Sequence, residues 1–370
     1  MCQSCASSVS VSVSGGDSGA QGGVPEFVGR LVGVINSAGL ALMISVGHRT
    51  GLFDAMSEGG ARAWSSEELA RSAGLSERYV REWLGAMATG RIVTLGADGR
   101  YTLPSEHAAW LTRRAEPNNI AVSMQWIGVL GAVESEVVWA FGHGRGVPYS
   151  AYGRRFHDVM ADESRQTTVL ALDSAIVPLV DGLHGRLERG ARVLDIACGK
   201  GLAMLHLARR YPRSRFVGVD LSEEAIEMGR REAAGVDNLE LVTGDVTTFG
   251  GKDEFDVVTA FDAIHDQAAP DRVLANIRRV LKPGGVLLMQ DIKARTAHAE
   301  NLDHPMGPFL YTISTMHCMS VSLANGGPGL GSAWGREKAE EMLHAAGFDG
   351  VSVHELAHDM INFYYVCRAG

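Results

Sequence analysis

The sequence predicts an α/β protein in which a parallel sheet follows a mainly helical N-terminal region. Two observations lead to this fold class. From Arg192 onward, short apolar segments rich in β-branched residues alternate with helical patterns, as strands and crossover helices do in parallel sheets. Before that point, apolar residues recur mostly at the spacing of helices. We therefore expect a sheet in the C-terminal half and packed helices in the N-terminal half.

The composition is that of a globular chain. Its 370 residues are enough for two domains, and an apolar share of 46% can supply a core to each. The net charge of −9 argues against a nucleic-acid partner, because phosphate binding draws on clustered Lys and Arg. It gives no reason to expect an anionic membrane surface either. No basic region precedes an apolar run at the N-terminus, so no signal peptide is recognised and a cytoplasmic location is expected.

The five cysteines are an odd and scattered set, which is typical of a reducing compartment rather than of a disulfide framework. Cys2 and Cys5 form one C-x-x-C pair, but a zinc site usually needs two further ligands, and none stands nearby. The acids and histidines elsewhere do not form a recognisable ligand set, so no metal is expected.

The chain divides into four predicted segments. Residues 1–24 are rich in Ser and Gly and are expected to be a disordered tail. Residues 25–116 form a small domain, 117–185 a helical connector that contributes to a substrate pocket, and 186–370 the α/β domain. Within the last, residues 295–334 are expected to be an irregular, lid-like insertion, because the stretch is too long for a simple connection.

A run of seventeen uncharged residues, Leu31–Gly47, raises the question of a membrane span. The run is shorter than the roughly 20 residues that a bilayer requires, and it includes Asn36, Ser37 and several glycines. We therefore predict a helix, starting near Pro25, that is buried or forms a dimer interface. No membrane partner is expected.

Residues 51–114 predict two short helices followed by a hairpin. Ser65 and Glu68 fit a capping box at the start of the first helix, and Ser76 is placed to cap the second. Two strands around a turn at 98–99 complete a wing. A winged helix is first suspected of binding DNA, but this segment carries eight acidic residues and eight arginines, so it has no basic face. No nucleic-acid partner is expected.

Seven strands are predicted for the α/β domain. They are Arg192–Ala197, Arg215–Asp220, Leu239–Thr243, Phe255–Phe261, Gly285–Asp291, Gly350–Leu356 and Phe363–Cys367.

Small and acidic residues at the ends of the first four strands indicate a nucleoside ligand. The first strand runs into a glycine-rich turn, which lets the backbone approach a ligand at the edge where open α/β sheets bind nucleotides. Asp220, at the end of the second strand, can accept both ribose hydroxyls of an adenosine. Asp245, after the third, can accept from an adenine amino group. The binding candidates are Asp195, Ala197, Gly199, Gly201, Asp220, Leu221, Gly244, Asp245, Val246, Phe261 and Asp262.

Over most of residues 190–291 the sequence resembles the class I S-adenosylmethionine (SAM)-dependent methyltransferases. Their first loop has the form D-x-G-x-G-x-G, which here runs from Asp195 to Gly201 with Ala197 in the place of the first glycine. The resemblance implies a Rossmann-like, seven-stranded sheet and SAM as the cofactor, held by the binding candidates named above. A pyridine-nucleotide dehydrogenase is the rival reading, but the loop lacks the G-x-G-x-x-G register.

His265 is the catalytic candidate. It follows the fourth strand in a His265-Asp266 pair, and His can act as a general base near neutral pH. Plant-type small-molecule O-methyltransferases, which the sequence resembles more loosely, place their catalytic His in a similar pair and carry a winged-helix domain that mediates dimerisation. This resemblance implies that His265 removes a hydroxyl proton from the acceptor and that the protein is a homodimer. The alternatives are that His265 only binds substrate or is structural.

The chain is also similar to bacterial, notably mycobacterial, winged-helix methyltransferases, through Met316–Ser320 and the glycines that follow it. We expect this stretch to wall the acceptor pocket. Candidates for acceptor contacts are Trp126, Phe156, His317 and Trp334, which suit a planar, partly apolar product of secondary metabolism. Methylation of nitrogen, sulfur or carbon in a small molecule or peptide remains an alternative, as does a SAM-binding transcriptional regulator.

Overall fold

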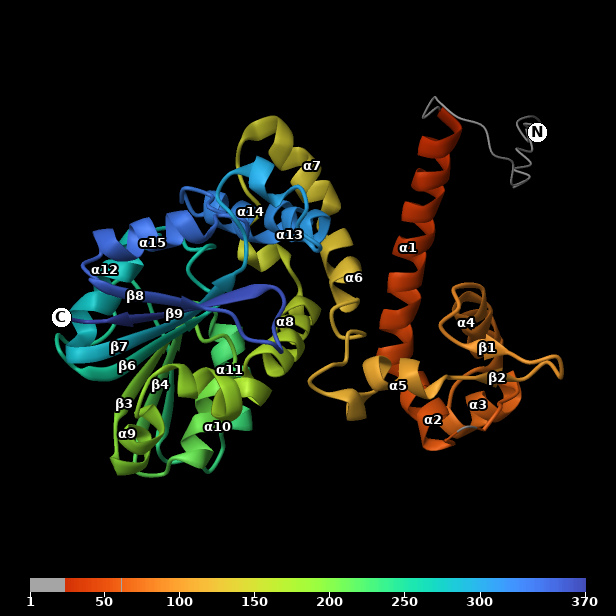
Figure 1. The fold of residues 1–370 in the computed structure, drawn as a ribbon, viewed down its shortest axis with the longest axis horizontal. Coiled ribbons are helices and arrows are strands. Elements are labelled where there is room, and N and C mark those ends of the chain that lie inside the picture. Colours follow the sequence, from red (N-terminus) through yellow and green to blue (C-terminus); the bar gives the residue numbers. More distant parts are fainter. Residues whose placement is uncertain (1–23, 61) are drawn as a thin grey trace.

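The computed structural model describes residues 24–60 and 62–370 (Figure 1). The N-terminal tail that is predicted to be disordered, with its Cys2/Cys5 pair, falls outside the residues that the structure describes. The description begins at Val24, the first residue of helix α1.

The N-terminal domain has the predicted winged-helix arrangement of short helices and a two-stranded hairpin. Its elements are α1 (Val24–Thr50), α2 (Leu52–Glu58), α3 (Ser66–Ala73), α4 (Glu77–Thr89), β1 (Thr94–Leu95), β2 (Tyr101–Thr102), α5 (Ser105–Leu111) and η1 (Arg113–Ala115).

The predicted start of α3 is confirmed. Ser65 Oγ accepts the backbone N–H of Glu68 at 3.2 Å, and the Glu68 carboxylate accepts the backbone N–H of Ser65, so the capping box is complete. Ser76 does precede α4, but its side chain makes no capping hydrogen bond, which corrects that expectation.

Helix α1 is only partly buried. Its C-terminal half joins the core of the domain, where Trp83 Nε1 donates to the Met43 carbonyl at 2.9 Å. Residues 25–39 are exposed, so the expectation of a helix buried within one chain is wrong for this half.

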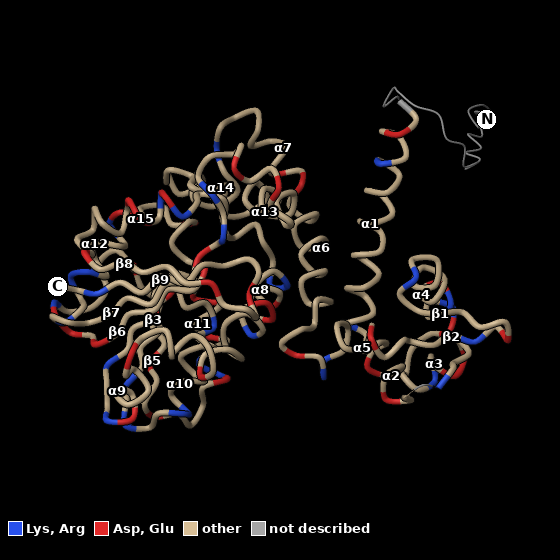
Figure 2. The backbone as a smooth tube through the Cα atoms, viewed as in Figure 1, with Lys and Arg blue, Asp and Glu red and all other residues tan. Residues whose placement is uncertain are grey.

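By length and composition alone, α1 is long enough and apolar enough to cross a membrane. The bent helix pair Arg154–Leu179 and Leu183–Arg189 meets the same criteria if its two helices are taken together as one broken span. Figure 2 shows that charges are nearly absent along α1.

The connector is helical, as predicted. It contains α6 (Gln125–Gly131), α7 (Glu134–His143), η2 (Tyr149–Ala151), α8 (Arg154–Thr167), η3 (Val169–Ala171), η4 (Leu172–Ile176), η5 (Val177–Leu179) and α9 (Leu183–Arg189). In Figure 1, α6 and α8 lie on the side of the α/β domain that faces α1.

The C-terminal domain has a seven-stranded sheet with the order β5-β4-β3-β6-β7-β9-β8. Its strands are β3 (Arg192–Ile196), β4 (Arg215–Asp220), β5 (Leu239–Thr243), β6 (Phe255–Phe261), β7 (Leu281–Ile292), β8 (Gly350–His354) and β9 (Asn362–Arg368). Strand β9 is antiparallel to both of its neighbours, and the other pairs are parallel. The order reverses between β3 and β6, which is where ligands bind in open α/β sheets.

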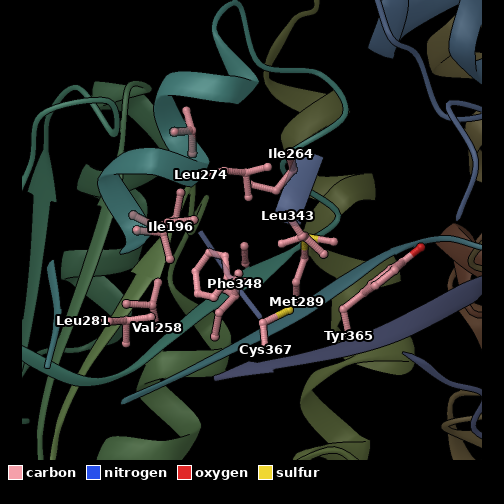
Figure 3. Packing of buried hydrophobic residues seen from close by; sticks show 14 of the residues in the cluster. Ile196, Val258, Ile264, Leu274, Leu281, Met289, Leu343, Phe348, Tyr365 and Cys367 are labelled. Carbon is pink, nitrogen blue, oxygen red and sulfur yellow. The ribbon is translucent and has the colours of Figure 1, made fainter. Parts of the chain in front are cut away.

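Helices cover both faces of this sheet. They include α10 (Leu202–Arg210), α11 (Glu223–Glu232), α12 (Pro270–Val280) and α15 (Arg336–Ala345). Apolar side chains of the central strands pack on the helices; Figure 3 shows Ile196, Val258 and Met289 beside Leu274 of α12 and Leu343 of α15. Burial of this apolar surface stabilises the sheet, whose strand ends carry the candidate site residues.

The expected irregular insertion is mostly helical, which is a correction. It contains η6 (His298–Asn301), α13 (Gly307–Ile313), η7 (Ser314–Cys318) and α14 (Met319–Ala324), and η7 is a π-helix. Helices α13 and α14 lie near α6 and α7 in Figure 1. The insertion is therefore a packed wall, and its π-turn is a local feature that is frequent at functional sites.

Candidate active site

One cavity of about 1070 Å³ opens at the carboxyl ends of β3, β4, β5 and β6. Its lining also includes α8, the helical insertion and the N-terminal part of the connector. The turns predicted to bind a nucleoside and the insertion thus line a single cavity.

The turn after β3 has the conformation that its small residues permit. Ala197, Gly199 and Gly201 have φ values of 51°, 56° and 68°, in the left-handed region that favours glycine. A Cβ atom on Gly201 would come within 2.5 Å of the Leu241 side chain, so the turn is also packed closely from behind. This turn brings backbone, rather than side chains, to the cavity.

Asp220 is held in a fixed position at the end of β4. Its carboxylate accepts the backbone N–H groups of Gly199 and Ser222, both at 2.8 Å. Burial raises the pKa of Asp220, although these two hydrogen bonds act in the opposite direction. The carboxylate therefore ties the turn after β3 to the end of β4, and it lines the cavity.

Two other acids that were predicted to bind the cofactor have different surroundings. Asp195 is buried and accepts from Thr259 Oγ1 at 2.6 Å, and burial raises its pKa to about 7. Asp245 is exposed, and the hydrogen bonds from Thr247 lower its pKa. Only Oδ1 of Asp245 receives these bonds, which leaves Oδ2 able to accept from a ligand.

Most of the predicted cofactor residues line the cavity, and two do not. These are Gly201 and Gly244, and the Gly244 N–H donates to the Asp220 carbonyl at 2.9 Å. The lining residues are Asp195, Ala197, Gly199, Asp220, Leu221, Asp245, Val246, Phe261 and Asp262. Oδ1 of Asp262 is buried without a hydrogen-bond partner, and burial raises the pKa of this carboxyl well above its usual range.

His265 lies at the cavity and is paired with Asp291 at the end of β7. Its Nδ1 donates to Asp291 Oδ1 at 2.7 Å, and both side chains are buried. Burial disfavours the charged imidazole, but the Asp291 carboxylate and the adjacent Cys318 raise the pKa of His265 well above its usual range. Trp334 Nε1 donates to the same Asp291 oxygen at 2.9 Å, which fixes the carboxylate in place.

The four predicted acceptor residues separate into two pairs. Trp126 and His317 line the cavity. Phe156 and Trp334 do not, which corrects the expectation that they face the acceptor. Phe156 packs edge-on against Trp126, with ring centroids 5.4 Å apart, and Trp334 belongs to the core behind Asp291. These two residues support the cavity wall from outside.

The sequence analysis missed Asp291, Cys318 and Glu163 as site residues. Asp291 ends a predicted strand, and this position alone indicated that it would lie at the carboxyl edge of the sheet. Cys318 had no such hint beyond its neighbour His317. Glu163 lines the cavity from α8, accepts from Ser123 Oγ at 3.0 Å, and has its pKa raised by burial. Among the residues that the structure describes, no three His, Cys, Asp or Glu side chains gather as a metal site requires.

Comparison with known proteins identifies two domains. Residues 38–113 match the Rv2258c-like winged HTH domain, and residues 187–354 match a methyltransferase domain. Phthiotriol/phenolphthiotriol dimycocerosates methyltransferase 1 of Mycobacterium ulcerans is 36% identical over 112 residues, which cover 30% of this chain and 41% of that protein. The chain thus spans about two fifths of the length of the curated relatives that it matches first.

Solved structures resemble most of the chain. Human N-acetylserotonin methyltransferase in complex with SAM superposes with a TM-score of 0.68 at 15% identity, covering 95% of this chain and all of that one. A candidate O-methyltransferase of Nostoc punctiforme gives a TM-score of 0.69 at 20% identity, covering 92% and 98%. The chain therefore consists of an Rv2258c-like winged HTH domain joined to a methyltransferase domain with the fold of the SAM-dependent methyltransferases.

Proposed function

We propose that this protein transfers the methyl group of SAM to a hydroxyl oxygen of a small, partly aromatic acceptor, with His265 as the general base. One observation carries the proposal: His265, which is paired with the buried Asp291, lines the same cavity as the turn after β3. A base is needed for a hydroxyl acceptor in particular, because its proton must leave as the oxygen is methylated.

The residues at the cofactor end of the cavity fit SAM. The turn after β3 offers close backbone approach, Asp220 and Asp245 present carboxylate oxygens, and Val246 supplies an apolar contact. Asp262 adds a buried oxygen that lacks a protein partner. When bound, SAM supplies an electrophilic methyl group on a sulfonium, and an acidic pocket complements that positive charge.

The chain's own residues then have separate tasks. Asp291 holds the His265 ring through Nδ1, so that Nε2 is the nitrogen able to accept the hydroxyl proton. Trp334 holds Asp291. Trp126, Phe309 and Ile313 give the acceptor end apolar walls, which exclude water and align a flat molecule. A factor of about 10² to 10⁴ in rate is typical of a positioned general base.

The first experiment is titration calorimetry of SAM and of its demethylated product, with Asp220→Ala beside the wild type. Micromolar binding that is lost in the variant is the expected result. Transfer of labelled methyl groups to a panel of phenols then tests the reaction, with His265→Ala expected to lose at least about 100-fold in kcat. His143→Ala, an exposed histidine on α7, is the matched control.

Either of two results contradicts the proposal. If folded wild type binds neither SAM nor its product, the cofactor assignment fails. If His265→Ala keeps near wild-type turnover on a hydroxyl acceptor, the base assignment fails, and methylation of nitrogen, sulfur or carbon becomes the better hypothesis.

We also propose that the protein is a cytoplasmic homodimer that uses the exposed half of α1 as its interface. The exposed side chains of this half include Phe27, Leu31 and Ile35, and the helix carries almost no charge. Along the backbone of the winged-helix domain, Arg and acidic residues are interspersed (Figure 2), which supports a role other than DNA binding.

A further inference from the structure

A chain of four buried side chains begins at Asp291 and ends at His317. Asp291 Oδ1 accepts from His265 Nδ1 at 2.7 Å, and the buried Cys318 is adjacent to His265 and contributes to its raised pKa. On its other side, Cys318 Sγ lies 3.6 Å from Nδ1 of His317. The least buried of the four, Cys318, is only 5% exposed. Cys318 therefore stands between the two histidines of the cavity and contacts His317 directly.

The far end of this chain lacks a partner. Nε2 of His317 is buried and makes no hydrogen bond, although His317 lines the cavity. An unpaired buried polar atom costs about 1–3 kcal/mol relative to a paired one. An atom of a bound molecule is the partner that the cavity can supply.

The position of the His317 ring is fixed by its surroundings. The ring centroids of Phe156, Tyr152 and Tyr149 lie 4.6, 5.2 and 5.8 Å from that of His317. The π-turn that carries His317 is secured by Tyr152, whose hydroxyl donates to the Met316 carbonyl. The ring is therefore enclosed by aromatic side chains.

The proposed reaction favours one direction for the hydrogen bond between Cys318 and His317. In the reactive complex, an acceptor hydroxyl donates to Nε2 of His265, so the single thiol proton of Cys318 is left to donate to Nδ1 of His317. Burial lowers the pKa of His317 to about 3, and the ring is neutral. A neutral imidazole that accepts at Nδ1 carries its proton at Nε2, so His317, a residue of the cavity lining, is a hydrogen-bond donor at Nε2.

We infer that His317 is a specificity-determining residue that donates from Nε2 to an oxygen of the acceptor, and that Cys318 holds His317 in this tautomer. The ligand class follows from these groups. It is a flat molecule that bears the hydroxyl to be methylated and a second oxygen, such as a carbonyl, that can accept a hydrogen bond. The inference rests on the proposed function for the identity of the ligand, but the tautomer can be tested without turnover.

The tautomer is tested by nitrogen NMR of the full-length protein with ¹⁵N-labelled histidine. The expected spectrum shows the His317 ring neutral, with a proton on Nε2 and none on Nδ1. Cys318→Ala is expected to mix the two tautomers, and Cys318→Ser to preserve the wild-type one. Cys367→Ala removes an equally buried thiol outside the cavity and is expected to leave the His317 signals in place. The resonance is assigned with His317→Gln or, if that variant does not fold, His317→Asn.

A proton on Nδ1 in the wild type overturns the inference, because Nε2 would then be an acceptor. Signals that do not change in folded Cys318→Ala overturn the role of the thiol.

Specificity is tested with two phenols of similar size, 3-hydroxyacetophenone and 3-ethylphenol, of which only the first has a second oxygen. We expect the ratio of their kcat/KM values to favour the ketone at least about 10-fold more in the wild type than in His317→Leu. His317→Gln, whose amide can donate, is expected to restore part of the preference. Equal ratios in wild type and His317→Leu overturn the inference. If neither phenol is methylated, the proposed function loses support, while the NMR result still decides the tautomer.

Discussion

Asp291 is the residue on which the polar contacts at the candidate catalytic centre converge. Its Oδ1 accepts from His265, from Trp334 and from the backbone N–H of Ile292, whereas its buried Oδ2 has no partner. One carboxylate oxygen thus orients the imidazole and raises its pKa. The charge on Asp291 sets the pH at which His265 becomes a free base.

Asp291→Asn is expected to shift the pH profile. A base acts only when deprotonated, so kcat/KM rises with pH through the raised pKa of His265. Removal of the carboxylate charge lowers that pKa, which moves the rising limb to lower pH, and the plateau falls because the ring is held less well. The measurement is kcat/KM against pH for both proteins. A rising limb at the same pH in the variant would show that His265 is not the titrating group.

At the residue scale, the sequence was informative where a short motif carried the information. His265 and the turn after β3 were found because their neighbours in sequence form a recognisable pattern. Asp291 stands 26 positions from His265, and only the register between β6 and β7 brings the two together. Cys318 was missed because no local sequence pattern shows which side chains a buried thiol contacts in the folded chain.

At the scale of elements, the strands were predicted well and the insertion was not. Runs of β-branched residues between turns mark strands clearly, and β4, β5 and β6 have the predicted bounds. The insertion contains glycines and prolines together with a π-turn, which places an extra residue in one turn and breaks the helical spacing. Its helices therefore had no regular pattern by which to be recognised.

The packing of α11 against the turn after β3 gives a prediction at this scale. A Cβ atom on Gly229 would collide with the carbonyl oxygen of Lys200, within that turn. Gly229→Ala is therefore expected to displace the turn and to weaken SAM binding at least about 10-fold, as a misplacement of about 1 Å can. Calorimetric Kd values provide the measurement. Gly85→Ala, in α4 with open space around it, is the control and should bind SAM as the wild type does.

For the molecule as a whole, the sequence predicted two domains and a connector but not the environment of α1. An uncharged helix can be covered by its own chain or by another, and only the three-dimensional structure separates these cases. Residues 25–39 are exposed here, so a second copy is the cover that we propose. Apolar area of this kind is favourably removed from water in a dimer.

Light scattering at micromolar concentration tests this association. The wild type is expected to have the mass of two chains, and Ile35→Glu the mass of one, because a charge buried in an apolar interface is costly. Tyr79→Glu changes an even more exposed side chain, on α4, and should remain dimeric. A monomeric wild type, or a dimeric Ile35→Glu, would exclude this interface.

The cavity takes part of its wall from outside the α/β domain. Ala41 of α1 and Trp110 of α5 line it together with residues 117–120, and we expect acceptors to enter beside the half-exposed Trp110. Selectivity at the entrance is therefore separable from the chemistry at the strand ends. Over evolution, recombination or drift in residues 25–116 can change which molecules are admitted while the cofactor pocket stays as it is. A chimera that exchanges only this segment would inherit the entrance of one parent and the methyl-transfer machinery of the other.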